Sequence, residues 1–158
     1  MAQELGRSAL LDSSPLLLWL AGKTDSRIIT RFKHLAMFQI DDYELLDRLL
    51  RDFSAIGTTP HVLTEVSNHA QHLKGPMGEA LFKTFRAFTA NAQERFVSSP
   101  VLSRREEFER FGLTDCALAE AGDEITVITT DFRLTGHLQA HGKHVINLNH
   151  LRQSRLLP

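Results

Sequence analysis

Four carboxylates spread along the chain are the residues best suited to chemistry: Asp12, Glu65, Asp115 and Asp131. Asp12 follows the apolar run at residues 8–11, and Asp131 follows the β-branched run at residues 125–129. In open parallel sheets, ligands bind outside the carboxyl ends of the strands. Carboxylates gathered there would repel one another unless a cation compensates them, and oxygen ligands favour Mg²⁺ or Mn²⁺ over zinc. The pattern predicts an acidic site for a divalent metal.

Each carboxylate also has a purely structural interpretation. Asp12 and Asp131 stand where a helix N-cap is expected, and Asp115 beside Thr114 fits the same role. Glu65 fits a solvated helix residue. Taken singly, the structural interpretation is the more common one. Only their convergence in space would favour the metal site, and the sequence by itself does not show it.

Further polar residues are candidates for supporting roles around the carboxylates. Ser13 and Thr129 are expected to hydrogen-bond them, and Asn68 lies on the same helical stripe as Glu65. Glu65, His69 and His72 also allow a zinc site, although no cysteine–histidine spacing supports it. Caps, strand packing and surface polarity explain the same residues structurally.

Basic residues in two stretches are candidates for gripping an RNA backbone. They are Arg27, Arg31, Lys33, Arg104 and Arg105. A run of charge is more often a solvated face, so RNA binding is the less common interpretation.

The elements that must position these residues alternate between strand and helix along the chain. Apolar runs predict strands at residues 8–11, 56–59, 125–129 and 144–148. Apolar residues at helical spacing predict helices beginning at Pro15 under a Ser14 cap, and at residues 41–53, 60–73, 79–90, 113–121 and 132–140. Gly75 to Gly78 is expected to break the chain. This order predicts an α/β fold with a central, mostly parallel sheet in a single domain, residues 1–158.

Composition sets broad limits. The 158 residues are 42% hydrophobic and 23% charged with a net charge of −1, which is typical of a globular protein and excludes a strongly basic nucleic-acid binder. The single cysteine, Cys116, fits a reducing compartment. The apolar run at residues 16–20 is too short to span a bilayer and is expected to be a buried helix. A cytoplasmic location, with no membrane partner, follows as the expectation.

At the four carboxylates the chain resembles the PIN domain family, which includes stand-alone bacterial ribonucleases. The resemblance rests on four segments in the family's order: LLDSS at 10–14, TPHVLTEVSN at 59–68, GLTDCALA at 112–119 and ITTDF at 128–132. The tail at residues 145–151 is also similar. Ser13 and Ser14 depart from the family's usual Thr and Asn, Cys116 replaces a small alanine, and residues 23–53 are longer than in compact toxins.

The resemblance implies a three-layer α/β/α fold and an endoribonuclease that depends on Mg²⁺ or Mn²⁺. Asp12 and Asp115 would be the leading metal ligands, Glu65 a further ligand or positioning group, and Asp131 a ligand or a carboxylate behind the ligands. A metal-activated water would attack phosphorus in line and expel the 3′ oxygen, which leaves a 5′-phosphate and a 3′-hydroxyl. Partners would be RNA, a second copy of the chain and, for a toxin of a toxin–antitoxin pair, the antitoxin protein.

Two other functions fit parts of the pattern. A non-catalytic PIN-like domain would bind RNA or protein, although it would not need all four carboxylates. A receiver-like doubly wound domain also gathers acids at strand ends. It would need a lysine at a strand end near the acids, whereas Lys143 precedes the final predicted strand.

Overall fold

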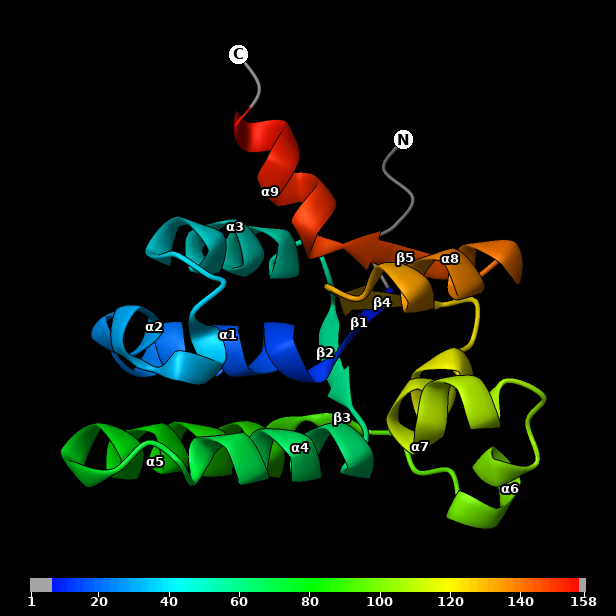
Figure 1. Ribbon diagram of the computed structural model, residues 1–158, viewed down its shortest axis with the longest axis horizontal. Helices are drawn as coiled ribbons and strands as arrows, with labels where there is room; N and C mark the ends of the chain where they lie inside the picture. Colours follow the sequence, from blue (N-terminus) through cyan, green and yellow to red (C-terminus); the bar gives the residue numbers. More distant parts are fainter. Residues whose placement is uncertain (1–6, 157–158) are drawn as a thin grey trace.

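The protein is built around a parallel sheet, seen in a computed structural model that describes residues 7–156. Five strands lie in the order β3-β2-β1-β4-β5, and every described pairing is parallel (Figure 1). Their bounds are β1 Ser8–Leu11, β2 Ala55–Thr58, β3 Gln93–Glu94, β4 Ile125–Thr129 and β5 His144–Asn147. The expected α/β fold with a central parallel sheet is confirmed.

Helices cover both faces of the sheet and make three layers. On one side lie α1 (Ser13–Thr24), α2 (Arg27–Arg31), α3 (Ile40–Leu50), α4 (Pro60–Ala70) and α5 (Gly75–Asn91). On the other lie α6 (Ser99–Ser103), α7 (Phe108–Ala119) and α8 (Phe132–Ala140) (Figure 1). A short 3₁₀ turn, η1 (Lys33–Leu35), follows α2, and α9 (Leu148–Leu156) extends from the end of β5.

The strand order reverses at the junction of β1 and β4. From β1 the chain moves outward to β2 and β3, then returns past β1 to build β4 and β5 on the other side. Because crossovers between parallel strands are right-handed, the helices of the two halves fall on opposite faces, and such sheets bind ligands at the strand ends where the order reverses. In this protein those are the carboxyl ends of β1 and β4.

Strand β1 has the bounds predicted for it, residues 8–11, and two further neighbouring elements also match, whereas others differ for local reasons. The strand at residues 125–129 and the helix at residues 132–140 have the predicted bounds. Gly75, expected to break the chain, instead begins α5 with a φ of 77°. Gly112 interrupts α7 with a φ of 80°, a conformation that side chains with a Cβ rarely adopt, so a turn precedes the predicted helix. Helix α1 is capped by Asp12, not by Ser14.

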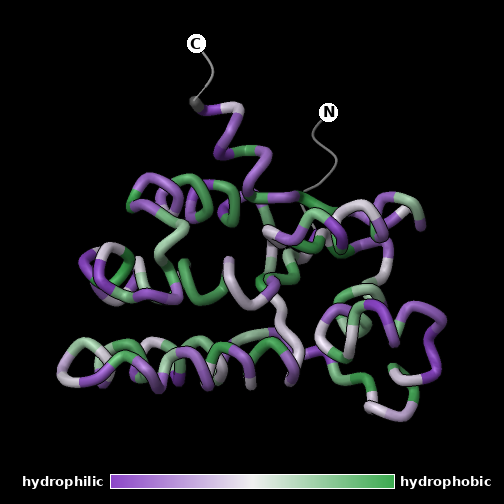
Figure 2. Tube along the Cα trace, viewed as in Figure 1, coloured by the Kyte–Doolittle hydropathy of each residue, from purple (hydrophilic) through white to green (hydrophobic). Residues whose placement is uncertain are grey.

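Three elements lie outside the sequence expectation: β3, α6 and α9. Strand β3 has only two residues, and α6 only five, so neither has room for a periodic pattern. Figure 2 shows α9 as predominantly hydrophilic, so this helix has no strong apolar stripe to predict it from. These elements depend on contacts with the rest of the fold.

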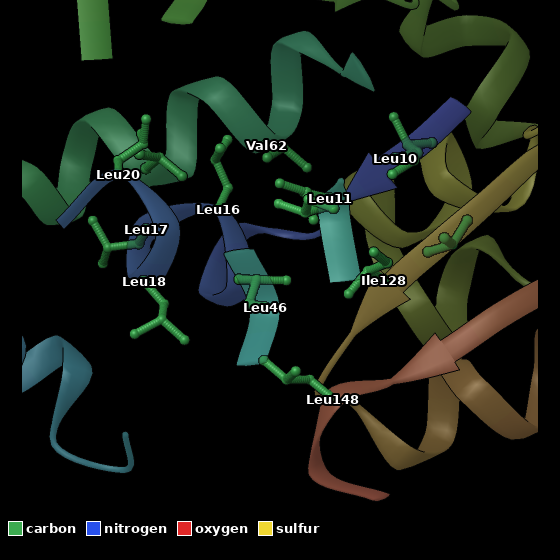
Figure 3. Close-up of a cluster of buried hydrophobic side chains, with 14 of the residues drawn as sticks. Leu10, Leu11, Leu16, Leu17, Leu18, Leu20, Leu46, Val62, Ile128 and Leu148 are labelled. Atoms are coloured by element: carbon green, nitrogen blue, oxygen red, sulfur yellow. The ribbon is translucent and has the colours of Figure 1, made fainter. Parts of the chain in front are cut away.

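The hydrophobic core holds the carboxyl ends of the strands in place. Leu16, Leu17, Leu18 and Leu20 are all buried, so α1 is enclosed on nearly every side, as the sequence predicted. Figure 3 shows these leucines beside side chains of β1, β4, α3 and α4. Each fully buried leucine contributes roughly 1.5–3 kcal/mol to folding. No helix within residues 7–156 is long and apolar enough to cross a membrane.

Candidate acidic site at the β1–β4 junction

Asp12 and Asp131 lie at adjacent strand ends. Leu11 of β1 is in register with Ile128 of β4, and the amide of Asp12 donates to the carbonyl of Ile128 at 2.9 Å. Each aspartate then caps the helix that follows its strand. The backbone pairing of two parallel strands therefore brings together carboxylates separated by more than a hundred residues.

Glu65 reaches the same place from α4. The hydroxyl of Ser13, the first residue of α1, donates to Glu65 Oε2 at 2.5 Å. The hydroxyl of Thr114 in α7 donates to Glu65 Oε1 at 2.5 Å. Both oxygens of Glu65 are thus held by hydroxyls from helices on opposite faces of the sheet, and Thr114 is the residue before Asp115.

A third hydroxyl links the two strand-end aspartates. Thr129, fully buried in β4, donates to Asp12 Oδ2 at 2.7 Å and accepts a hydrogen bond from the amide of Asp131 at 3.1 Å. The other oxygen of Asp12 accepts from the amide of Ser13 at 2.7 Å. Ser13 and Thr129 therefore contact the carboxylates as the sequence predicted.

The carboxylates interact electrostatically. Burial raises the pKa of Asp12, and the charges of Glu65 and Asp131 raise it further, against the hydrogen bonds from Thr129 and the Ser13 amide, which lower it. Burial, together with the charges of Asp12, Asp131 and Glu65, raises the pKa of Asp115 to about 7. The structure thus brings all four predicted site residues into one electrostatically coupled group.

The structural interpretation as helix N-caps holds for two of the four residues. Asp131 Oδ1 accepts the amides of Arg133 and Leu134, so it is a true N-cap of α8, as Asp12 is of α1. Asp115 is different, because it lies inside α7 and caps nothing. Among residues 7–156, no hydrogen bond or ion pair holds its carboxylate. It is the carboxylate most in need of a counter-charge.

The donor set has the chemistry of a site for a hard divalent cation. All four side chains offer oxygen, and the excess of negative charge is what a cation would relieve. Within the described residues, no group of three or more His, Cys, Asp or Glu forms a ready metal-binding set. Mg²⁺ commonly uses only one or two carboxylates and fills its shell with water and phosphate oxygens, so the donors fit such an ion.

Asn68 and the predicted basic residues lie elsewhere. Asn68 is exposed and lines the groove between α4 and α5, with no described contact to Glu65. Arg27, the first residue of α2, forms an ion pair with Asp25 at 2.6 Å. Helix α2, which also contains Arg31 and is followed by Lys33, lies beyond the end of α1 that is opposite to Asp12 (Figure 1). Helix α1, which separates Arg27 from Asp12, has 12 residues and is about 18 Å long.

In the second basic stretch, Arg105 forms ion pairs with nearby carboxylates of the protein. It pairs with Glu107 at 2.6 Å and also with Glu120, while Arg104 is exposed at the end of α6. Arg105 is therefore held by protein carboxylates.

The histidines considered for zinc form a separate cluster. His72 Nδ1 and His34 Nε2 are 2.8 Å apart, and the rings of His34 and His69 are 4.4 Å apart. Glu65 instead contacts Ser13 and Thr114. Within residues 7–156, Glu65, His69 and His72 therefore do not form a metal-binding group.

Two residues near the site were missed at the sequence level. Thr114 holds Glu65, and its position directly before Asp115 was the available signal, since hydroxyls also neighbour Asp12 and Asp131. Arg133 lowers the pKa of Asp115 through its charge, against the larger raising effects. It stands two residues after Asp131, a position that a search for basic runs passes over.

Comparison with models of protein families, with curated proteins and with solved structures finds no match for this chain.

Proposed function

We propose that this protein is a divalent-metal-dependent endoribonuclease whose site is formed by Asp12, Glu65, Asp115 and Asp131. The observation that carries the proposal is the coupled carboxylate group at the reversal of strand order, where parallel α/β sheets bind ligands. A pKa of about 7 for Asp115 means that its negative charge lacks compensation. Carboxylates with a perturbed pKa at such strand ends are characteristic of functional sites. The resemblance to PIN domains supplies the substrate class.

The chain's own residues would act by holding the ion and the substrate in place. Asp12 and Asp115 would hold Mg²⁺ or Mn²⁺, with Glu65 and Asp131 as further carboxylates. When bound, the ion supplies Lewis acidity toward a phosphate oxygen and activates water for attack on phosphorus. The hydroxyls of Ser13, Thr114 and Thr129 keep the carboxylates oriented.

Supporting residues and location complete the proposal. Arg133 would offset the charge of an incoming phosphate, because its charge already acts at Asp115. The single cysteine, Cys116, is buried and free, which is compatible with the reducing cytoplasm as the place of action.

RNA cleavage by metal-loaded and metal-free protein tests the proposal. A mixed-sequence RNA is incubated with Mg²⁺, Mn²⁺ or EDTA, using the intact protein, Asp12→Asn and Asp115→Asn. We expect metal-dependent cleavage that leaves 5′-phosphates. Each site variant should lose roughly a hundredfold or more in cleavage rate, the scale of removing one group that stabilises the transition state electrostatically. Asp52→Asn is the matched control, because Asp52 is exposed and precedes β2, away from the strands' carboxyl ends.

Three outcomes would reject the nuclease. They are cleavage that persists in EDTA, unchanged cleavage by both site variants, and products that end in a cyclic 2′,3′-phosphate. A thermal melt without RNA gives a second reading: at a free Mn²⁺ concentration of about 100 times the Kd, binding should stabilise the protein by about 2.7 kcal/mol. Asp115→Asn should reduce this gain, and Asp52→Asn should keep it.

The toxin role is a finer part of the proposal and has its own test. Induced expression of a toxin would arrest growth, and co-expression of the neighbouring gene's product would relieve the arrest. Growth that continues while RNA is cleaved in vitro would instead favour an RNA-processing enzyme.

A further inference from the structure

An exposed phenylalanine adjoins the acidic site. Phe132 is the first residue of α8 and directly follows Asp131 in sequence, so their Cα atoms are about 3.8 Å apart. Its side chain is 56% exposed, whereas Leu134 and Leu138 of the same helix are buried. Helix α8 is therefore anchored by its leucines, and Phe132 is not needed for that packing.

The ring of Phe132 lies against the ring of His150 in α9. The ring centroids are 5.3 Å apart and the planes are inclined by 51°. Both residues are exposed, and they come from elements that follow β4 and β5, next to each other in the sheet. Phe132 and His150 thus form a small aromatic surface, which we call the Phe132–His150 surface, at the edge of the carboxylate group.

The guanidinium groups of Arg133 and Arg110 both lie against the ring of Phe111. The guanidinium carbon of Arg133 is 5.4 Å from the centroid of the Phe111 ring, and that of Arg110 is 4.7 Å from it. The ring centroids of His137 and Phe111 are 4.9 Å apart. Stacking on an aromatic ring fixes a guanidinium while leaving its N–H groups free to donate. Arg133 also acts electrostatically on Asp115, so this positive charge borders the acidic centre.

Aromatic surface and positive charge beside a phosphate-handling site are the features that bind single-stranded nucleic acid. Bases stack on aromatic side chains without regard to sequence, and cationic groups follow the backbone. In a duplex the base faces are already stacked and unavailable. An exposed ring next to the reacting phosphate therefore favours an unpaired strand.

We propose that the Phe132–His150 surface stacks an unpaired base of the RNA strand whose phosphate lies at the acidic site, with Arg133 contacting a neighbouring phosphate. This inference rests on the proposed ribonuclease function and adds to it the side chains that contact a base beside the reacting phosphate. Phe132 is a binding residue that positions the strand.

Binding to RNA with and without bases tests the surface directly. Fluorescence anisotropy is measured with a labelled oligouridylate and with an abasic ribose-phosphate strand of the same length, in Ca²⁺ and again in EDTA. For Phe132→Leu we expect at least roughly fivefold weaker binding of the oligouridylate, the lower bound of what one stacked base contributes. Binding of the abasic strand should not change. Phe132→Tyr should bind like the intact protein.

Phe96→Leu is the matched control, since Phe96 is 75% exposed and the preceding Arg95 pairs with Glu124 at the amino end of β4. Circular dichroism checks that each variant is folded. The inference is overturned if the intact protein binds neither strand, if Phe132→Leu binds the oligouridylate normally, or if it loses both strands equally. Base-dependent binding lost in Phe132→Leu, without metal-dependent cleavage by the intact protein, would reject the nuclease and keep the surface.

Discussion

Carboxylates in two regions of this protein differ in how far their negative charge is compensated. Asp42 of α3 is only 1% exposed, yet Arg152 and Arg155 of α9 donate to its Oδ1 at 3.0 and 2.7 Å, and the amide of Gln39 donates to its Oδ2 at 2.7 Å. At the β1–β4 junction the carboxylates meet hydroxyls, amides and one another. There, burial and like charge raise the pKa of Asp12 and Asp115.

The difference shows that burial alone does not mark a functional carboxylate. Asp42 has two guanidiniums and completes a capping box at the start of α3, so its charge serves to dock α9. Asp115 has no such partner among the described residues, and under the proposed function a bound cation would compensate its charge. Under the proposed function, the compensated acid would serve stability and the uncompensated acids would serve the site.

The largest effect should come from breaking the compensated group. Asp42→Ala removes the capping box and leaves Arg152 and Arg155 without their carboxylate, so we expect a loss of about 2–3 kcal/mol in the free energy of unfolding. Urea denaturation followed by circular dichroism measures it. The neighbouring exposed Asp41→Ala should cost less than about 0.5 kcal/mol. Equal losses in the two variants would contradict the structural role assigned to Asp42.

Neutralising Asp115 in the uncompensated group should instead raise the free energy of unfolding. Asp115 has a pKa of about 7 in the folded protein against 3.8 for the ordinary group, so the folded state binds more protons between these values and loses stability as the pH rises from about 4 to 7. Above that window, Asp115→Asn should be more stable than the intact protein in EDTA. We expect about 1–2 kcal/mol, less than the full shift implies, because water partly screens this half-buried group.

Thermal melts of both proteins in EDTA, from pH 4.5 to 8, measure this effect. The two melting curves should converge at the acid end, and the variant's remaining pH dependence should reflect Asp12, whose pKa is also raised. An Asp115→Asn protein that is less stable than the intact protein at pH 8 would show that Asp115 is compensated after all.

The smallest change in the free energy of unfolding should come from removing one hydroxyl that contacts the carboxylates at the β1–β4 junction. Thr129→Val preserves shape but removes the donor to Asp12 and the acceptor for the Asp131 amide, so we expect a loss of about 1 kcal/mol. The hydrogen bond from Thr129 lowers the pKa of Asp12, so its loss should raise that pKa further. Thr126→Val on the same strand is the control, because no side-chain hydrogen bond is described for Thr126. If both variants melt alike, the Thr129 contacts contribute nothing.

Local sequence was enough to predict the elements nearest the site. The β-branched run at residues 125–129 and the helix at residues 132–140 have the predicted bounds, because strand propensity, an N-cap carboxylate and a closing glycine act within a few residues. The buried character of α1 also followed from its unbroken leucines. Strand β3, helix α6 and the start of α5 were not predictable in this way, since they are short or depend on a glycine with positive φ.

The sequence by itself determined which residue types follow the strands, and hence that Asp12 and Asp131 end β1 and β4. Only the tertiary structure decided that Glu65 and Asp115 join them, through Ser13 and Thr114. The tertiary structure also decided that Arg27 lies far from the four carboxylates, whereas Arg133 lies close to them. The physical reason is range: caps and strand propensities are local, whereas electrostatic coupling depends on distances that the chain sets only when distant helices pack on one sheet.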